Sequence, residues 1–176
     1  NWKVSNHMST LSVDTIQGQT TAANVKLPEG SIVQTVQYLR RGLNATNMSS
    51  LVNVQTSSFV DVMSKAIVTK FANSLIFVKM NCVYYETQSG QSARSSTKIL
   101  RNSTQINADL YGAYNAYNIM GNYLVSMLDT PSAAAGTTLT YKLQAKRQAG
   151  SGQCYWGYGD GSGGSSASIV LMEIAQ

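Results

Sequence analysis

Few residues of this chain have the types and spacing that catalysis requires. His7 is the one histidine among 176 residues, so any Ser or Cys nucleophile with a histidine base would depend on it. Glycoside hydrolysis needs two carboxylates about 5 to 9.5 Å apart. The eight Asp and Glu residues are instead scattered, and several adjoin expected turns, namely Asp61, Glu86, Asp129 and Asp160. We therefore expect a protein that is not an enzyme.

Metal and cofactor motifs are not evident either. The glycine-rich segment GDGSGGSS (159–166) lacks the repeated oxygen ligands of a calcium loop. No Walker-type or dinucleotide-binding fingerprint occurs. We expect no metal and no cofactor.

The residues best suited to contact a partner are aromatic. Segment 153–164 (QCYWGYGDGSGG) sets aromatic residues among glycines, and segment 103–122 carries three tyrosines at three-residue spacing. Such rings offer a large rigid contact area at low entropic cost. The candidate receptor-binding residues are Tyr155, Trp156, Tyr158, Asp160, Tyr111, Tyr114 and Tyr117. The sequence leaves open the alternative that the aromatic residues fill the core or a seam between subunits.

Composition limits the class of partner. Apolar residues make up 43% of the chain but charged residues only 12%, about half the usual charged share. The net charge of +5 comes from basic residues spread between Lys3 and Arg147, whereas a nucleic-acid-binding protein clusters them. No apolar run approaches the ~18 residues of a membrane-spanning helix. We expect a soluble protein with no nucleic-acid partner and no membrane insertion.

The elements that must position these residues are β-strands. No stretch of twelve or more residues has helical periodicity, while short runs rich in β-branched and aromatic residues alternate with Gly, Pro, Ser, Asn and Asp clusters. Many short strands favour an antiparallel sandwich or barrel. The expected strands are 31–39, 58–63, 65–71, 74–86, 97–102, 122–128, 138–146, 152–156 and 167–174.

The remaining segments are expected to lack regular structure. Residues 1–30 hold isolated apolar residues among Thr, Asn and Gln, and we interpret them as an extended N-terminal arm or collar ahead of a head domain over 31–176. Residues 103–122 are interpreted as an ordered loop. Cys82 and Cys154 are the two cysteines, and spacing alone does not decide whether they form a bridge. Cys82 alternates with apolar residues of the expected strand 74–86, which indicates a small buried side chain.

The last strand is apolar on both faces. Val170, Met172 and Ile174 alternate with Ile169 and Leu171, and Leu75 to Val78 repeat the pattern. A lone sandwich covers one face of each sheet. We therefore predict a closed homo-oligomer that meets through the C-terminal strand and the strand over 75–85, with interface residues Ile169, Leu171, Ile76, Val78 and Tyr84. The alternative is that residues 1–30 fold back over this face.

The order of several segments resembles the C-terminal jelly-roll heads of bacteriophage tail fibres, especially those of marine phages. The segments are LPEGSIVQTV (27–36), 58–85, TKILRNST (97–104), 123–146 and SASIVLMEIAQ (166–176). In that family a segment like TPKFAxSKILV follows the opening strand; here IVTKFANSLIFV lacks its Pro and its second Lys.

The resemblance implies an all-β, antiparallel jelly-roll sandwich akin to complement globular heads and tumour-necrosis-factor domains. It also implies a homotrimer with the C-terminal strand near the threefold axis, located in the virion. From it we expect a non-catalytic tail-fibre head that binds a host receptor, either a polysaccharide or an outer-membrane protein, and contacts other virion proteins through the N-terminal arm. The alternatives are a head-fibre or cement trimer on the capsid or tail and, from the enzyme class, a polysaccharide depolymerase.

Overall fold

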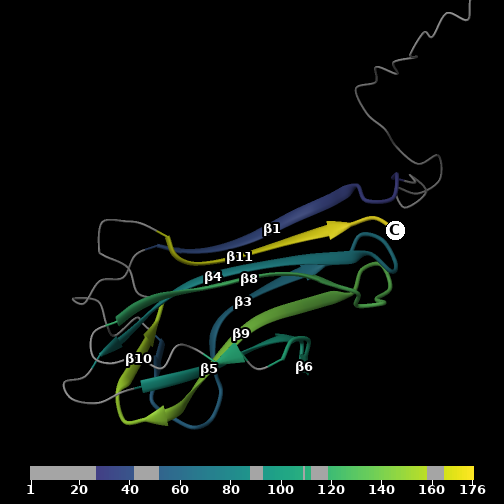
Figure 1. Cartoon of the computed structure of the whole chain (residues 1–176). Coiled ribbons are helices and arrows are strands. Elements are labelled where there is room, and N and C mark those ends of the chain that lie inside the picture. The colour runs from purple at the N-terminus through teal and green to yellow at the C-terminus, as the bar shows by residue number, and fades with distance from the viewer. Residues whose placement is uncertain (1–26, 42–51, 88–92, 109, 112–118, 158–164) are drawn as a thin grey trace, which may run out of the picture.

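The computed structural model describes residues 27–41, 52–87, 93–108, 110–111, 119–157 and 165–176. Every regular element within these ranges is a β-strand (Figure 1). The strands are β1 (Ile32–Arg41), β2 (Val52–Val54), β3 (Val60–Val68), β4 (Leu75–Thr87), β5 (Ala93–Arg101), β6 (Thr104–Gln105), β7 (Leu110–Tyr111), β8 (Ile119–Asp129), β9 (Thr138–Gly150), β10 (Gln153–Trp156) and β11 (Ser165–Ile174).

The strands form two antiparallel sheets that lie face to face; in Figure 1, β1, β11, β4 and β8 of the first sheet (sheet A) lie above β9 and β5 of the second (sheet B). Sheet A has the order β1-β11-β4-β10-β2, and β8 pairs with the other edge of β4. Sheet B has the order β3-β9-β5-β6, and β7 also pairs with β5. The chain passes repeatedly from one sheet to the other, as in a jelly roll. The predicted all-β, antiparallel jelly-roll sandwich is thus confirmed.

Most expected strands are present. Two predictions were wrong: that 58–63 and 65–71 are separate strands, and that 103–122 is a loop. The runs 58–63 and 65–71 are one strand, β3, whose pairing with β9 shifts register between Asp61 and Met63. This bulge turns Val62 and Met63 inward together, which breaks the alternation expected of a regular strand. The expected loop 103–122 contains β6, β7 and the start of β8.

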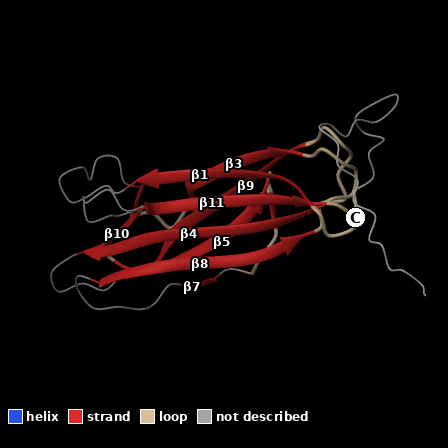
Figure 2. Ribbon diagram, turned by 90° about the horizontal axis from the view of Figure 1, so that it is seen from above, coloured by secondary structure: helices blue, strands red, loops and turns tan. Residues whose placement is uncertain are grey.

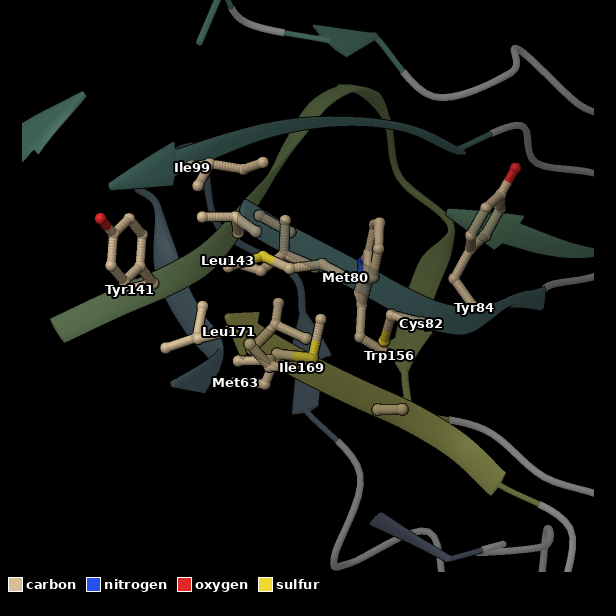
Figure 3. Close-up of a cluster of buried hydrophobic side chains, with 14 of the residues drawn as sticks. Met63, Met80, Cys82, Tyr84, Ile99, Tyr141, Leu143, Trp156, Ile169 and Leu171 are labelled. Carbon is tan, nitrogen blue, oxygen red and sulfur yellow. The ribbon is translucent and has the colours of Figure 1, made fainter. Parts of the chain in front are cut away.

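The core lies between the sheets and is built from alternate residues of each strand. Figure 3 shows Trp156, Cys82 and Met80 from sheet A near Ile99 and Leu143 from sheet B. On β4 the buried positions are Ile76, Val78, Met80, Cys82 and Tyr84. The predicted inward position of Cys82 is therefore confirmed.

The five residues predicted as the oligomer interface belong to this core. Ile76, Val78, Ile169 and Leu171 are 0% exposed and Tyr84 is 8% exposed within the single chain. Sheet B already covers them, so they have no surface left for a second copy. The interface prediction selected the wrong face of β4 and β11, and the opposite face is the one available for contact.

The apolar C-terminus is held inside sheet A. β11 pairs with β1 on one edge and with β4 on the other. Beyond the strand, Ala175 N–H donates to the Ser31 carbonyl at 2.9 Å, and Gly30 N–H donates to the Ala175 carbonyl at 2.9 Å. A strand with both edges paired resists fraying, so these contacts hold the apolar segment in place.

Glu173 is a buried carboxylate that joins β11 to the turn between β3 and β4. Its side chain accepts hydrogen bonds from the backbone N–H groups of Lys70 (2.8 Å) and Phe71 (2.9 Å) and from the Gln34 amide. Burial raises the pKa of Glu173, but these hydrogen bonds outweigh burial and hold that pKa below its usual value. The carboxylate therefore stabilises the fold in its ionised form.

We predict that Glu173→Gln lowers the free energy of unfolding by about 2 kcal/mol at neutral pH, because one charged acceptor oxygen becomes an amide donor facing N–H groups. The melting temperature should fall by roughly 4 to 8 °C. Since the folded-state pKa is depressed, this stabilisation is present above the unfolded-state pKa and is lost as the pH falls through the folded-state pKa. Thermal melts of both proteins should therefore converge in acid. A constant difference at every pH would contradict the role of the charge.

A second polar contact links the two sheets near one end of the sandwich. Asp129, the last residue of β8, accepts hydrogen bonds from Arg101 of β5 at 2.8 Å and from the Tyr141 hydroxyl of β9 at 2.6 Å. Burial and the adjacent carboxylate raise the pKa of Tyr141, so the phenol stays protonated and donates. Asp129 is a structural strand-end residue, as its position next to a turn predicted.

Candidate interaction surface

The outer face of sheet A has no covering layer in the described chain. Figure 2 views the sandwich from this side, where β1, β11, β4 and β8 lie next to one another. Residues that alternate with the core positions point outward from each strand. On β11 they are Val170, Met172 and Ile174; on β4 they include Leu75, Phe77, Val83 and Tyr85.

These apolar side chains form rows across the strands. Met172 of β11 stands opposite Phe77 of β4, and Phe77 stands opposite Leu128 of β8. Ile174 is likewise opposite Leu75 and Ile32. These two rows are neighbours on one face and form an apolar patch at one end of sheet A. Farther along the same face the outward positions include polar residues, namely Gln37, Lys79, Ser126, Ser168, Asn81 and Asn122.

Much of this surface is open to solvent in the single chain. Leu124 is 61% exposed, Leu128 52% and Met120 54%, all on β8, and Ile32 of β1 is 60% exposed. Lys79 is the one charged residue among the outward side chains of β1, β11, β4 and β8 that the structure describes. Exposed apolar side chains that gather on one face with a single charged residue favour an interaction surface.

The structure corrects the receptor-binding interpretation of Trp156. Trp156 is 1% exposed, with its ring centroid 5.2 Å from that of Tyr84 and 6.0 Å from that of Tyr123. β10 buries it because the strand pairs with β4 on one side and β2 on the other. Trp156 is a core residue, and a receptor could reach its ring only by disrupting the fold.

The other candidate aromatic residues are placed only in part. Tyr155 is 9% exposed, and its hydroxyl hydrogen-bonds to Gln153, so it offers little free surface. Tyr111 lies in β7, which pairs with β5. Tyr114, Tyr117, Tyr158 and Asp160 lie outside the described residues, as does His7. The receptor contact proposed for these three tyrosines and Asp160 stays a prediction.

Both cysteines are free and buried. Burial raises the pKa of the Cys82 thiol to about 12, so the group is protonated and unreactive at neutral pH. Among the described residues, no group of three His, Cys, Asp or Glu side chains could hold a metal ion. The same residues contain no helix long and apolar enough to cross a membrane.

No protein-family model and no curated protein sequence matches the chain. Solved structures with a similar arrangement include the VP2 subviral particle of infectious bursal disease virus, with a TM-score of 0.39 and 10% identity over 82% of this chain. The Gt strain of that virus gives a TM-score of 0.37 and 10% identity over 83% of this chain. Latent PorU from Porphyromonas gingivalis gives 0.36 and 9% identity over 85%. The chain spans 42%, 38% and 14% of these proteins, respectively.

Proposed function

We propose that this chain is the head of a homotrimeric, non-catalytic virion protein, placed at the end of a phage tail fibre, where it binds a receptor on the host surface. The observation that carries the proposal is the exposed apolar outer face of sheet A. The order of sequence segments shared with tail-fibre heads supports the location in the virion. The N-terminal arm, residues 1–30, would join the head to other virion proteins.

Assembly through sheet A follows from the energy of burial. Covering one Leu, Ile or Met side chain contributes about 1.5 to 3 kcal/mol. Association of rigid bodies costs on the order of 4 to 15 kcal/mol. Leu124, Leu128, Met120 and Ile32 are 52% to 61% exposed, so covering them contributes roughly 3 to 7 kcal/mol per chain. This offsets the lower part of that cost, and the half-buried apolar residues of β4 and β11 on the same face add to it. Copies that meet through this face place their sheets B outward.

Receptor binding by such an assembly depends on repetition. A weak site that occurs once per chain is presented three times per head and again on every fibre, so the avidity exceeds the affinity of one contact. The receptor proposed is a host polysaccharide or an outer-membrane protein.

The location can be tested by labelling intact particles with an antibody raised against the chain. We expect label at the ends of the tail fibres, and purified head should compete with particles for adsorption to host cells. Label on the capsid without competition would favour the architectural trimer instead. Unlabelled particles would contradict a virion role. Release of reducing ends from host glycan would contradict the non-catalytic role.

A further inference from the structure

The outer face of sheet B differs from that of sheet A because it carries lysines. β9 has its buried positions at Tyr141, Leu143 and Ala145, so the residues that alternate with these positions point outward. These outward residues include Lys142 and Lys146, and β5 adds Lys98 opposite Gln144. This face therefore has the cationic character that sheet A lacks.

One of the three lysines is already neutralised within the sheet. The Lys142 ammonium lies 2.9 Å from the Asp61 carboxylate of β3. The Gln144 amide donates to the other oxygen of Asp61 at 2.6 Å. The hydrogen bonds from Gln144 and Lys142 hold the pKa of Asp61 below its usual value, so the carboxylate is ionised at neutral pH. The charge of Lys142 is therefore already paired, which leaves the other two lysines as the candidates to bind an anion.

The other two lysines share one aromatic ring. The Lys98 Nζ is 4.2 Å and the Lys146 Nζ 4.6 Å from the centroid of the Phe59 ring. Their strand positions are diagonal neighbours, because Ser96 pairs with Lys146 and Lys98 pairs with Gln144. In the part of the chain that the structure describes, neither ammonium group forms an ion pair.

The loop that carries Phe59 is attached to the same sheet. Arg147 N–H of β9 donates to the Thr56 carbonyl at 2.9 Å, and the Thr56 hydroxyl donates to the Ser58 carbonyl at 3.1 Å. The ring is thus held over the sheet, and each ammonium group is attracted to it. Because the two ammonium groups lie 4.2 and 4.6 Å from the same ring centroid, they are at most 8.8 Å apart. Holding both charges in place before a ligand arrives reduces the entropy lost on binding an anionic chain.

We propose that Lys98 and Lys146, positioned by Phe59, bind the anionic groups of an acidic polysaccharide, such as its carboxylates or sulfates. An anion at this site relieves the repulsion between the two ammonium groups. Nucleic acid fits the site less well, because a protein that binds a duplex neutralises many phosphates, whereas this site offers two ammonium groups. In addition, the ammonium groups already occupy the Phe59 ring, so it is not free to stack on bases.

This proposal identifies an acidic polysaccharide as the class of receptor for the proposed function. It rests on the proposed function only for the number of sites, because assembly would repeat the site once per chain. Lys98, Lys146 and Phe59 all belong to one chain, so a single copy contains the whole site. If copies pack through the outer face of sheet A, each presents one lysine pair at the outside of the assembly.

The test measures binding of the full chain to immobilised alginate, a polyuronate, with neutral dextran as the control surface. We expect salt-sensitive binding to alginate and none to dextran. Lys98→Gln with Lys146→Gln should weaken alginate binding by at least about tenfold, since both charges are lost. The matched control, Lys65→Gln with Lys70→Gln, removes two charges elsewhere and should bind as the wild type does.

Equal alginate binding by the two double variants would overturn the site, as would tighter binding of the wild type to duplex DNA than to alginate. Absence of wild-type binding to both alginate and dextran sulfate would also overturn it. Light scattering on the same samples separates this result from the proposed assembly. If the chain is a trimer that binds neither alginate nor dextran sulfate, the lysine site alone is contradicted. If it is a monomer that binds alginate through the lysine pair, the proposed assembly alone is contradicted.

Discussion

Leu124→Asp is expected to separate the subunits while leaving the fold of each chain intact. Leu124 is 61% exposed in the single chain, so the substitution removes little from the core. In the assembly it would place a carboxylate in an apolar seam, where an unpaired charge is strongly unfavourable. We expect a loss of at least about 3 kcal/mol per subunit, on the order of a hundredfold in the dissociation constant.

Sedimentation velocity at matched concentrations measures this effect, and circular dichroism checks the fold. Ala66→Asp provides the control, because Ala66 is an exposed residue of β3 on the outer face of sheet B. The control should assemble as the wild type does. Assembly of Leu124→Asp with wild-type affinity would show that sheet A does not form the seam.

Trp156→Ala is expected to have the largest effect on stability. Replacing a fully buried aromatic residue leaves a cavity and typically removes about 3 to 5 kcal/mol. For a chain of this size the melting temperature should fall by roughly 6 to 20 °C. Trp156→Phe keeps most of the ring and should be milder, by about half. Both variants should be compared at equal chain concentration, because association raises the melting temperature.

The same variant separates a core role of Trp156 from a receptor role. If Trp156 contacts a receptor, its removal lowers cell binding while the melting temperature stays within a few degrees of wild type. The structure predicts the reverse: cell binding falls only to the extent that the chain unfolds. A stable Trp156→Ala protein that no longer binds cells would therefore contradict the buried position.

The fold class could be predicted from sequence because strand periodicity is a local property. Alternating apolar residues and turn clusters located most of the long strands and the inward side of Cys82. The β3 bulge was not visible, because adjacent Val62 and Met63 are both apolar and no local signal indicates that both turn inward. The two-residue strands β6 and β7 depend on pairing with β5 and have no periodicity of their own.

Which apolar face of the last strand points inward could not be predicted in the same way. Glu173 shares its face with Ile169 and Leu171, and a carboxylate ordinarily marks the exposed side of a strand. The structure places that face in the core because Lys70, Phe71 and Gln34 supply hydrogen bonds to the carboxylate. These partners are distant in sequence, so no local pattern reveals them.

Trp156 illustrates the same limitation for the binding residues. A tryptophan followed by a glycine-rich segment suggests an exposed loop, but β10 fits between β4 and β2 and carries the ring into the core. The lysine pair was not recognised in the sequence, where Lys98 and Lys146 are far apart. Only the register of β5 with β9 and the position of Phe59 bring them together.

The central claim is that copies of this chain cover the apolar outer face of sheet A for one another. Multi-angle light scattering of the purified chain at micromolar concentration tests it most directly. We predict one species with three times the 19.0 kDa mass of the single chain. A monodisperse species with the mass of one chain would contradict it.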